Sequence, residues 1–234
     1  MIIDVIIPAF NEEESIKHVL NDIPKDIVRE IIVVNNNSTD NTELVAHQNG
    51  AKVIFEKEKG YGRACLKGVE YLSSKSKKPY VVVFLDADYS DYPEQMKDLV
   101  RPIIQKEMDL VIGSRVMGNA EKKSMTLQQR FGNWLATRLI LLIYGFRYTD
   151  LGPFRAIDFN KLLDLNMTDK NYGWTVEMQL KAVKKKLRVM EVPVDYRKRI
   201  GMSKISGTIK GTILAGYKII TTIFKYSFSK SCQY

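Results

Sequence analysis

The sequence predicts an α/β fold in which helices cover a mostly parallel sheet. Short runs rich in Ile and Val recur along the chain, and the stretches between them carry apolar residues at helical spacing. Parallel strands need crossover connections, usually helices, which cover both faces of the sheet. A chain of 234 residues can bury one sizeable core or two small ones, and 45% hydrophobic residues exclude intrinsic disorder.

The strands are predicted from the Ile- and Val-rich runs. They are Ile2–Pro8, Glu30–Asn35, Lys52–Phe55, Tyr80–Asp86 and Asp109–Gly113, followed much later by Leu187–Tyr196. Pro193 has no N–H group for a ladder hydrogen bond, so we expect the last strand at an edge of the sheet.

The helices are predicted in the stretches that separate and follow these strands. One starts near Asn11, and the others are Thr42–His47, Tyr61–Ser74, Glu94–Gln105, Gln128–Ile143 and Thr175–Lys186. The first turn of the first helix would hold Glu12, Glu13 and Glu14, where the helix dipole favours negative charge. Asp40 is a suitable cap for the second helix.

The C-terminal part of the chain differs in composition from the rest. Residues 201–212 are rich in Gly, Ser, Thr and Lys, which favours a loop, and an amphipathic helix is predicted beyond it. Its apolar side chains share one face, while Lys210, Lys218 and Lys225 share another. We therefore divide the chain into a body, residues 1–205, and a tail, residues 206–234. The tail helix either anchors the protein on a membrane surface, which we favour, or packs against the body or a second subunit of a homo-oligomer.

The formal net charge of +9 is unevenly distributed. Residues 181–234 carry +11, whereas residues 1–180 carry −2. A strongly basic segment favours an anionic partner such as a membrane surface. Nucleic acid is not expected, because no aromatic residues are interleaved with the lysines of the tail before Tyr217. A non-catalytic basic module that binds a membrane or nucleic acid stays open as an alternative.

Several features indicate the cellular compartment. Cys65 and Cys232 are too few and too far apart for a disulfide framework, and no signal-peptide pattern follows Met1. The most apolar stretches, Leu135–Phe146 and Ile213–Phe224, are interrupted by basic residues and fall short of the roughly 20 residues that span a bilayer. We expect a cytoplasmic protein that lies peripherally on the inner face of the membrane.

The strongest signal for chemistry is the pair Asp86 and Asp88, which ends the apolar run Val81–Leu85. Side chains two apart on an extended backbone point the same way, and open α/β sheets bind ligands at the carboxyl ends of their strands. Two such carboxylates suit a hard divalent cation, Mg²⁺ or Mn²⁺. The alternative is that they cap the turn or helix that follows.

The sequence lacks the motifs of several other enzyme classes. No Gly-x-x-x-x-Gly-Lys segment provides a P-loop, and Cys65 stands where a dinucleotide-binding motif starting at Gly60 needs its third glycine. His18 and His47 have no partner at metal-ligand spacing. Zinc chemistry and a Ser-His-Asp triad are therefore not expected.

Ordered motifs connect these residues with a known family. They are Ile6–Glu12, Val33–Asp40, Gly60–Gly62, Asp86–Asp88, Gly113–Arg115, and Arg199–Lys204 preceded by Glu191–Pro193. Together they resemble the inverting glycosyltransferases of family 2, which have the GT-A fold. The last motif resembles the dolichyl-phosphate mannose synthase-like branch, which includes bacterial polyprenyl-phosphate glycosyltransferases. The resemblance runs from residue 2 to about residue 205.

The resemblance implies a role for each matching residue. The nucleotide-sugar donor would be bound by Pro8, Ala9, Asn11, Glu12, Asn36, Gly60, Gly62, Asp86 and Arg115. The metal would be held by Asp86 and Asp88, the acceptor and phosphate side would include Arg155 and Ser203, and catalysis would rest on Asp88, Asp150, Arg199 and Lys204. The segment from Arg199 to Lys204 would close over phosphate.

The sequence departs from the family pattern in three places. Asn36 stands where Asp is usual, which leaves the nucleotide base open. Ser90 stands where Gln is often found, so the third metal ligand is open, with Asp91 as a substitute. The segment Asp150–Arg155 also differs from the usual form, which leaves the acceptor less determined than the reaction.

Two acceptors are considered. A polyprenyl phosphate is already ionised at neutral pH and needs no general base, which agrees with the lack of a catalytic histidine. A hydroxyl of a soluble molecule or glycan needs one, and Asp150 is the candidate by its position in the resemblance. We favour the lipid phosphate. Glu177, on a predicted helix with Val176 and Leu180, is interpreted as a surface or structural carboxylate.

Overall fold

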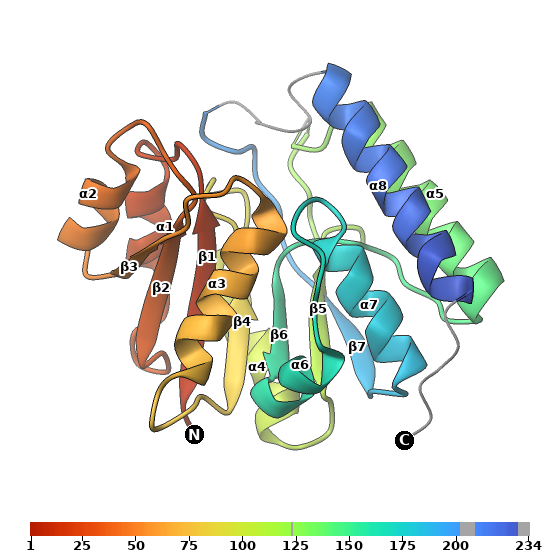
Figure 1. Ribbon diagram of the computed structural model, residues 1–234, viewed down its shortest axis with the longest axis horizontal. Helices are drawn as coiled ribbons and strands as arrows, with labels where there is room; N and C mark the ends of the chain where they lie inside the picture. The colour runs from red at the N-terminus through yellow and green to blue at the C-terminus, as the bar shows by residue number, and fades with distance from the viewer. Residues whose placement is uncertain (123, 202–208, 229–234) are drawn as a thin grey trace.

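The computed structural model describes residues 1–122, 124–201 and 209–228. At its centre is a seven-stranded sheet in the order β3-β2-β1-β4-β6-β5-β7 (Figure 1). The strands are β1 (Ile3–Ala9), β2 (Glu30–Asn35), β3 (Lys52–Phe55), β4 (Val81–Phe84), β5 (Leu110–Ser114), β6 (Arg155–Asp158) and β7 (Val189–Pro193). All pairings are parallel except those of β6, which is antiparallel to both neighbours. The predicted fold class is confirmed.

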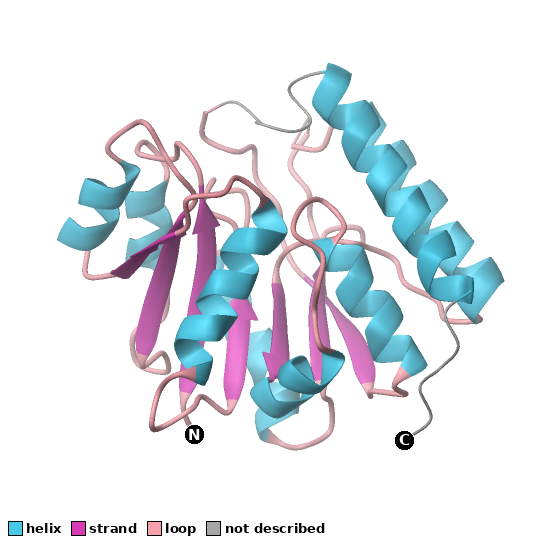
Figure 2. Cartoon of the chain, viewed as in Figure 1, coloured by secondary structure: helices cyan, strands magenta, loops and turns pink. Residues whose placement is uncertain are grey.

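Helices cover both faces of this sheet (Figure 2). They are α1 (Ile16–Asp22), α2 (Thr42–Gln48), α3 (Tyr61–Ser73), α4 (Met96–Ile104), α5 (Leu127–Tyr144), α6 (Phe159–Leu165), α7 (Trp174–Lys184) and α8 (Ile209–Phe228), with a short 3₁₀ turn at Pro93–Gln95. No described helix has a stretch that is both long and apolar enough to span a bilayer.

Each face of the sheet has its own hydrophobic core. Ile6, Ile32 and Phe84 pack on one face with residues of α3, α5, α6, α7 and α8. The neighbouring strand positions Val5 and Val33 point to the opposite face, where α1, α2 and α4 cover them. This alternation along each strand accounts for the continuous apolar runs from which the strands were predicted.

Two predictions need correction. Strand β6 and helix α6 were not expected, because the short segment Arg155–Asp158 begins and ends with a charged residue and shows no apolar run. The first helix begins at Ile16, not near Asn11. The backbone N–H groups of Asn11, Glu12 and Glu13 donate instead to side chains of the β2–α2 loop and of the first residue of α2, which holds this segment out of the helix. The glutamates therefore do not occupy its first turn.

The tail helix α8 lies beside α5 and also contacts α7 (Figure 1). Ile223 is fully buried in the core of that face, and the Tyr144 hydroxyl of α5 donates to the Ile223 carbonyl at 2.6 Å. Its other side carries exposed apolar residues, including Ile213 and Tyr217. The helix thus packs on the body and still presents an apolar surface outward.

Candidate active site

The candidate site lies at the carboxyl ends of the parallel strands. The chain leaves β1 towards β2 on one side and later returns to β4 on the other side of β1. Such a reversal of strand order separates the loops above it and is where open α/β sheets bind ligands. Most of the predicted site residues that the structure describes lie in the loops after β1, β2, β4, β5 and β7. The exceptions are Pro8 and Ala9 at the end of β1, and Gly60, Gly62, Asp150 and Arg155. Ser203 and Lys204 fall outside the described residues.

Strand β1 ends with Pro8 and Ala9, which are both buried, and the loop towards α1 follows. Asn11 has a positive φ of 54°, a conformation that Asn tolerates better than most residues. Its side-chain oxygen accepts from the Thr39 N–H group at 2.8 Å. Glu12 follows, and its N–H group donates to the Thr42 hydroxyl at 2.8 Å. Its carboxylate accepts from the Ser15 hydroxyl at 2.9 Å.

Asn36, directly after β2, holds the loop that precedes α3. Its side-chain oxygen accepts from the Gly60 N–H group at 2.7 Å, and its amide donates to the Glu58 carbonyl at 2.7 Å. A carboxylate at this position could accept the first bond but could not donate the second. Asn36 thus has a structural task beside its predicted contact with the base.

Gly60 and Gly62 have a steric reason to be glycine. A Cβ atom on Gly60 would overlap the carbonyl oxygen of Lys170, and one on Gly62 would overlap that of Asp169. The loop before α7 therefore packs directly on the start of α3. Between the two glycines, Tyr61 is partly buried and its hydroxyl oxygen is shielded from solvent. This burial, and secondly the charge of Asp86, raise the pKa of Tyr61 well above the usual range.

The carboxylates after β4 are crowded and poorly neutralised. Burial, and then the neighbouring Asp88, raise the pKa of Asp86 to about 7. The Asp86 Oδ1 atom and both carboxylate oxygens of Asp91 are buried without a hydrogen-bond partner in the described part of the chain. Asp88 accepts from the Ser90 N–H group at 3.0 Å.

Arg199 connects this cluster with the loop after β1. Its Nη1 atom lies 3.0 Å from Asp88 Oδ2, and its Nη2 atom lies 2.8 Å from Glu12 Oε1. The Ile200 N–H group donates to the Asp88 carbonyl at 3.0 Å, which fastens the same segment to the β4 loop. The structure therefore brings together Glu12, Asp88 and Arg199, as residues of one site require.

The donor set fits a divalent cation. Unpaired buried carboxylate oxygens are costly, and an added cation would relieve both their desolvation and their mutual repulsion. Asp86 and Asp88 would supply oxygen ligands of the kind that Mg²⁺ and Mn²⁺ prefer. Among the described residues, no three His, Cys, Asp or Glu side chains are grouped as a metal cluster. Asp91 as a third ligand stays a prediction.

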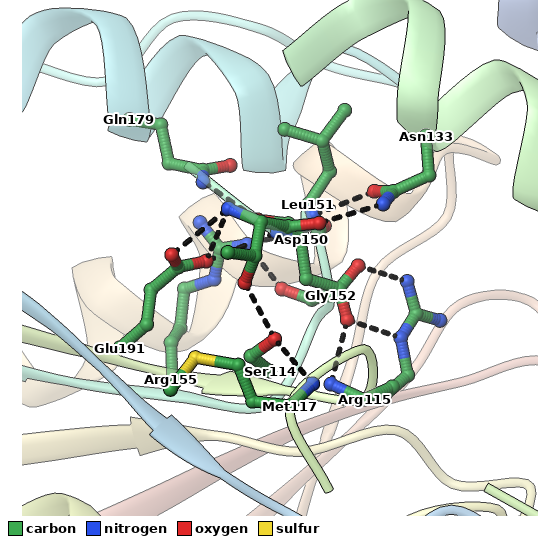
Figure 3. Close-up of polar contacts among 11 residues, drawn as sticks. Ser114, Arg115, Met117, Asn133, Asp150, Leu151, Gly152, Arg155, Gln179 and Glu191 are labelled. Carbon is green, nitrogen blue, oxygen red and sulfur yellow. Dashed lines mark hydrogen bonds and ion pairs between the residues drawn. The ribbon is translucent and has the colours of Figure 1, made fainter. Parts of the chain in front are cut away.

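Asp150 and Arg115 form an ion pair in which the carboxylate is fully buried (Figure 3). The Arg115 guanidinium donates to both oxygens of Asp150, at 2.8 and 2.7 Å, and the Arg115 N–H group donates at 2.8 Å. Asp150 has no exposed surface. Burial raises the pKa of Asp150, but the Arg115 guanidinium outweighs it, and the pKa is lowered. The carboxylate is thus ionised and fully occupied by Arg115.

Side chains from three further elements fix the loop that carries Asp150 (Figure 3). Glu191 of β7 accepts from the Thr149 and Asp150 N–H groups, and Gln179 of α7 donates to the Asp150 carbonyl at 2.9 Å. Asn133 of α5 donates to the Thr149 carbonyl and accepts from the Leu151 N–H group, both at 2.9 Å. Asp150 is therefore rigidly placed.

Arg155 points into the protein rather than towards a surface. It is fully buried on β6 and donates to the carbonyls of Gly152 and Thr175. In this position it supports the turn after Asp150, and the structure does not bring it together with Arg199 through any described contact. Its predicted role on the acceptor side stays a prediction.

Sequence reasoning missed Arg197. Its guanidinium lies over the rings of Tyr89 and Tyr92, 3.5 and 4.0 Å from their centroids, and its N–H group donates to the Ser90 carbonyl. The signal available in the sequence was a basic residue two positions before Arg199, together with two tyrosines next to the Asp86–Asp88 motif. Arg197 joins the β4 loop to the segment that carries Arg199.

Comparison with known proteins agrees with this geometry. The family model described as glycosyl transferase family 2 matches residues 4–166. An uncharacterized glycosyltransferase of Mycobacterium tuberculosis is 35% identical over 91% of this chain and 94% of that protein. A UDP-N-acetylglucosamine–dolichyl-phosphate N-acetylglucosaminyltransferase of Methanococcus voltae is 31% identical over 82% of this chain and 84% of that protein.

A solved structure shares the whole architecture. Glucosyl-3-phosphoglycerate synthase from Mycobacterium tuberculosis superposes with a TM-score of 0.78 at 20% identity, covering 98% of this chain and 80% of that one. The fold is therefore the GT-A fold that the motifs implied. With the family model matching more than half of its residues, the chain belongs to glycosyltransferase family 2.

Proposed function

We propose that the protein transfers a sugar, with inversion, from a nucleotide-diphosphate sugar to a polyprenyl phosphate at the inner face of the membrane. The observation that carries the choice of acceptor is the state of Asp150. The carboxylate that would deprotonate a hydroxyl acceptor is buried and paired on both oxygens with Arg115. A phosphate acceptor is already ionised and requires no such base.

The donor side of the proposal rests on the loops after β1 and β4. A divalent metal at Asp86 and Asp88, when bound, would neutralise charge on the departing nucleoside diphosphate. The protein's own contribution is the guanidinium of Arg199, which ion pairs with Glu12 and Asp88 hold in place next to the proposed metal site. Preorganised positive charge next to a leaving group stabilises the transition state. The glucosyl-3-phosphoglycerate synthase structure contains Mn²⁺ and UDP, which supports this class of donor and metal.

The lipid acceptor is supported by two independent features. The relative from Methanococcus voltae is named for transfer to dolichyl phosphate. Helices α5 and α8, which lie side by side, contain no Asp or Glu and expose large apolar side chains. These are Leu127, Phe131, Trp134 and Leu142 on α5 and Ile213, Leu214, Tyr217 and Phe224 on α8. Apolar and basic surface without acidic residues suits an anionic lipid leaflet.

The proposal is tested by assaying the purified protein with Mn²⁺, a panel of radiolabelled UDP- and GDP-sugars, and three acceptors. The acceptors are polyprenyl phosphate, polyprenol, and a mixture of soluble sugars and phosphoglycerate. We expect label in the lipid fraction with polyprenyl phosphate alone, and none after Asp88→Ala. Polyprenol is the matched control because it differs only in lacking the phosphate.

The rival hypothesis is transfer to a hydroxyl of a soluble molecule or glycan. It predicts product in the water-soluble fraction and none with polyprenyl phosphate, and that result would overturn the proposed acceptor. A non-catalytic basic module predicts that no donor is consumed with any acceptor and that Asp88→Ala changes nothing.

A further inference from the structure

We infer that helix α8 is a positioning element of the donor site and that Tyr226 and Lys218 are its positioning residues. The inference rests on the proposed function, in that the loops after β1, β2 and β4 bind a nucleotide-sugar. It goes further by assigning the tail helix a task within catalysis. The connection runs from α8 to the loop before α7 and from there to the start of α3.

The first step joins α8 to two buried carboxylates. The Tyr226 hydroxyl donates to Glu177 Oε1 at 2.6 Å, and the Lys218 ammonium lies 2.9 Å from Asp169 Oδ2. Glu177 has no exposed surface, and Asp169 is also buried. Hydrogen bonds to buried charged groups are the stronger kind. Helix α8 is therefore attached to the body by two polar contacts to buried carboxylates, in addition to its apolar packing.

The second step joins these carboxylates to the backbone of the loop before α7. Glu177 accepts from the N–H groups of Thr168 and Asp169, at 3.1 and 2.7 Å, and from the Thr168 hydroxyl at 2.7 Å. Asp169 in turn accepts from the N–H groups of Asn171 and Gly173, at 2.8 and 3.1 Å. The two carboxylates thus define the path of residues 168–173.

The third step joins this loop to the start of α3. The carbonyls of Asp169 and Lys170 pack so closely on Gly62 and Gly60 that neither position has room for a Cβ atom. The Arg63 N–H group also donates to the Lys170 carbonyl at 3.1 Å. Because the contact is backbone against backbone, a displacement of the loop cannot be absorbed by a side-chain rotation.

The last step reaches the donor site. The Gly60 N–H group is held by Asn36, directly after β2. Between the glycines, Tyr61 is partly buried with its hydroxyl oxygen shielded from solvent, and the charge of nearby Asp86 helps to raise the pKa of that hydroxyl. Asn36 is the predicted contact to the base, and Asp86 is a predicted metal ligand. A shift of residues 168–173 would therefore move both ends of the nucleotide subsite.

A matched pair of variants tests this inference. Tyr226→Phe removes the hydroxyl that binds Glu177. Tyr144→Phe removes a hydroxyl that also fastens α8, through the Ile223 carbonyl at 2.6 Å, but that leads to α5 and not to the loop. Both changes are chemically identical and weaken the seating of α8, so a general loss of stability would affect them alike.

The measurement is the Kd for UDP, GDP and TDP with Mn²⁺, by calorimetry without lipid, using the nucleotide that the wild type binds most tightly. Coupling through such a network changes affinity by roughly 2- to 30-fold, and we expect about 5-fold weaker binding for Tyr226→Phe. Tyr144→Phe should bind as the wild type does. Lys218→Met, at a half-exposed residue whose loss does not threaten the fold, should also weaken nucleotide binding.

A kinetic readout separates positioning from damage. Tyr226→Phe should raise KM for the nucleotide-sugar while kcat at saturating donor and KM for the acceptor stay unchanged. Equal nucleotide Kd values for Tyr226→Phe and Tyr144→Phe would overturn the inference alone. Absence of nucleotide binding by the wild type would overturn the proposed function and this inference with it.

Discussion

At the level of single residues, Asp150 is a fully buried carboxylate whose two oxygens both accept from one guanidinium. Its two oxygens hold the Arg115 guanidinium in one orientation beside the β5 loop. Removing one partner of a buried pair leaves the other charge uncompensated, at a cost of about 3–5 kcal/mol. The ion pair with Asp150 therefore restricts the Arg115 side chain to one position.

Asp150→Asn should lower kcat for the transfer by roughly 10- to 100-fold. Without the Asp150 carboxylate the Arg115 guanidinium loses its fixed position, and a small misplacement of a group beside the donor is enough to slow the reaction that much. The pH dependence of kcat should keep its shape, since Asp150 is already ionised and paired. Steady-state kinetics between about pH 6 and pH 9 check both points. Loss of a rising limb in the variant's pH profile would contradict the positioning role and indicate a base.

The lowered pKa of Glu177 predicts how the free energy of unfolding changes in acid. Burial raises its pKa, but hydrogen bonds from Lys181, Tyr226 and Thr168 outweigh it and lower the pKa below the usual 4.5. The charged carboxylate therefore stabilises the fold fully above its unfolded pKa, and this stabilisation is lost as the pH falls through the lower folded pKa.

Urea unfolding of Glu177→Gln and wild type between about pH 7 and pH 3 checks this. We expect the variant to be less stable at neutral pH and the difference in free energy of unfolding to shrink as the pH falls below the usual value of 4.5. A difference that is constant over the whole range would show that the charge of Glu177 does not contribute.

At the level of elements, the contact between α3 and the loop before α7 is set by glycine. Gly62→Ala places a Cβ atom against the Asp169 carbonyl, so the loop must move, whereas a Cβ on Gly132 in α5 meets nothing within 4 Å. Gly62→Ala should lower both the melting temperature and the affinity for nucleotide. Gly132→Ala, the matched control, should stabilise the protein by up to about 1 kcal/mol because alanine favours helix. Unchanged nucleotide affinity in Gly62→Ala would refute the role of this contact.

Elements with a strong local pattern could be predicted from the sequence. The runs Glu30–Asn35 and Lys52–Phe55 form strands with the predicted bounds, and the edge position of β7 follows from Pro193. Strand β6 could not be predicted, because it is a short segment held by pairing on both sides with β4 and β5, which are distant in the sequence. The start of α1 depends on side chains of the β2–α2 loop and of the first residue of α2, which no local pattern near Asn11 reveals.

The same distinction holds for the site. Asp86 and Asp88 follow a strand directly and could be located from their spacing alone. The bond between Arg199 and Glu12 joins residues 187 positions apart, and only the sheet order brings them together. The resemblance supplied those residues, and the structure supplied their contact.

At the level of the whole molecule, the uneven charge predicts binding to anionic vesicles. Leu142 on α5 is 80% exposed, and Leu44 on α2, far from the proposed lipid face, is 54% exposed. Burying a leucine in lipid is worth about 1.5–3 kcal/mol, so Leu142→Ser should weaken vesicle binding by roughly 10-fold or more. Leu44→Ser should not.

Cosedimentation with phosphatidylglycerol vesicles measures both variants, and added NaCl should weaken binding of each because screening reduces the attraction of the basic residues. Equal retention of both variants would argue against α5 as part of the lipid face. Equally strong binding to neutral and anionic vesicles would show that the basic residues do not contribute to membrane binding.

The burial of Ile223 has a practical consequence for dissecting this protein. Truncation before α8 would remove more than a membrane contact, because it would uncover the apolar seat of Ile223 and leave Glu177 without Tyr226. A shortened protein that fails to bind lipid could equally have aggregated or lost its donor site. Substitutions confined to exposed side chains of α5 and α8 leave the interior intact, and they are the means by which attachment and catalysis can be measured separately.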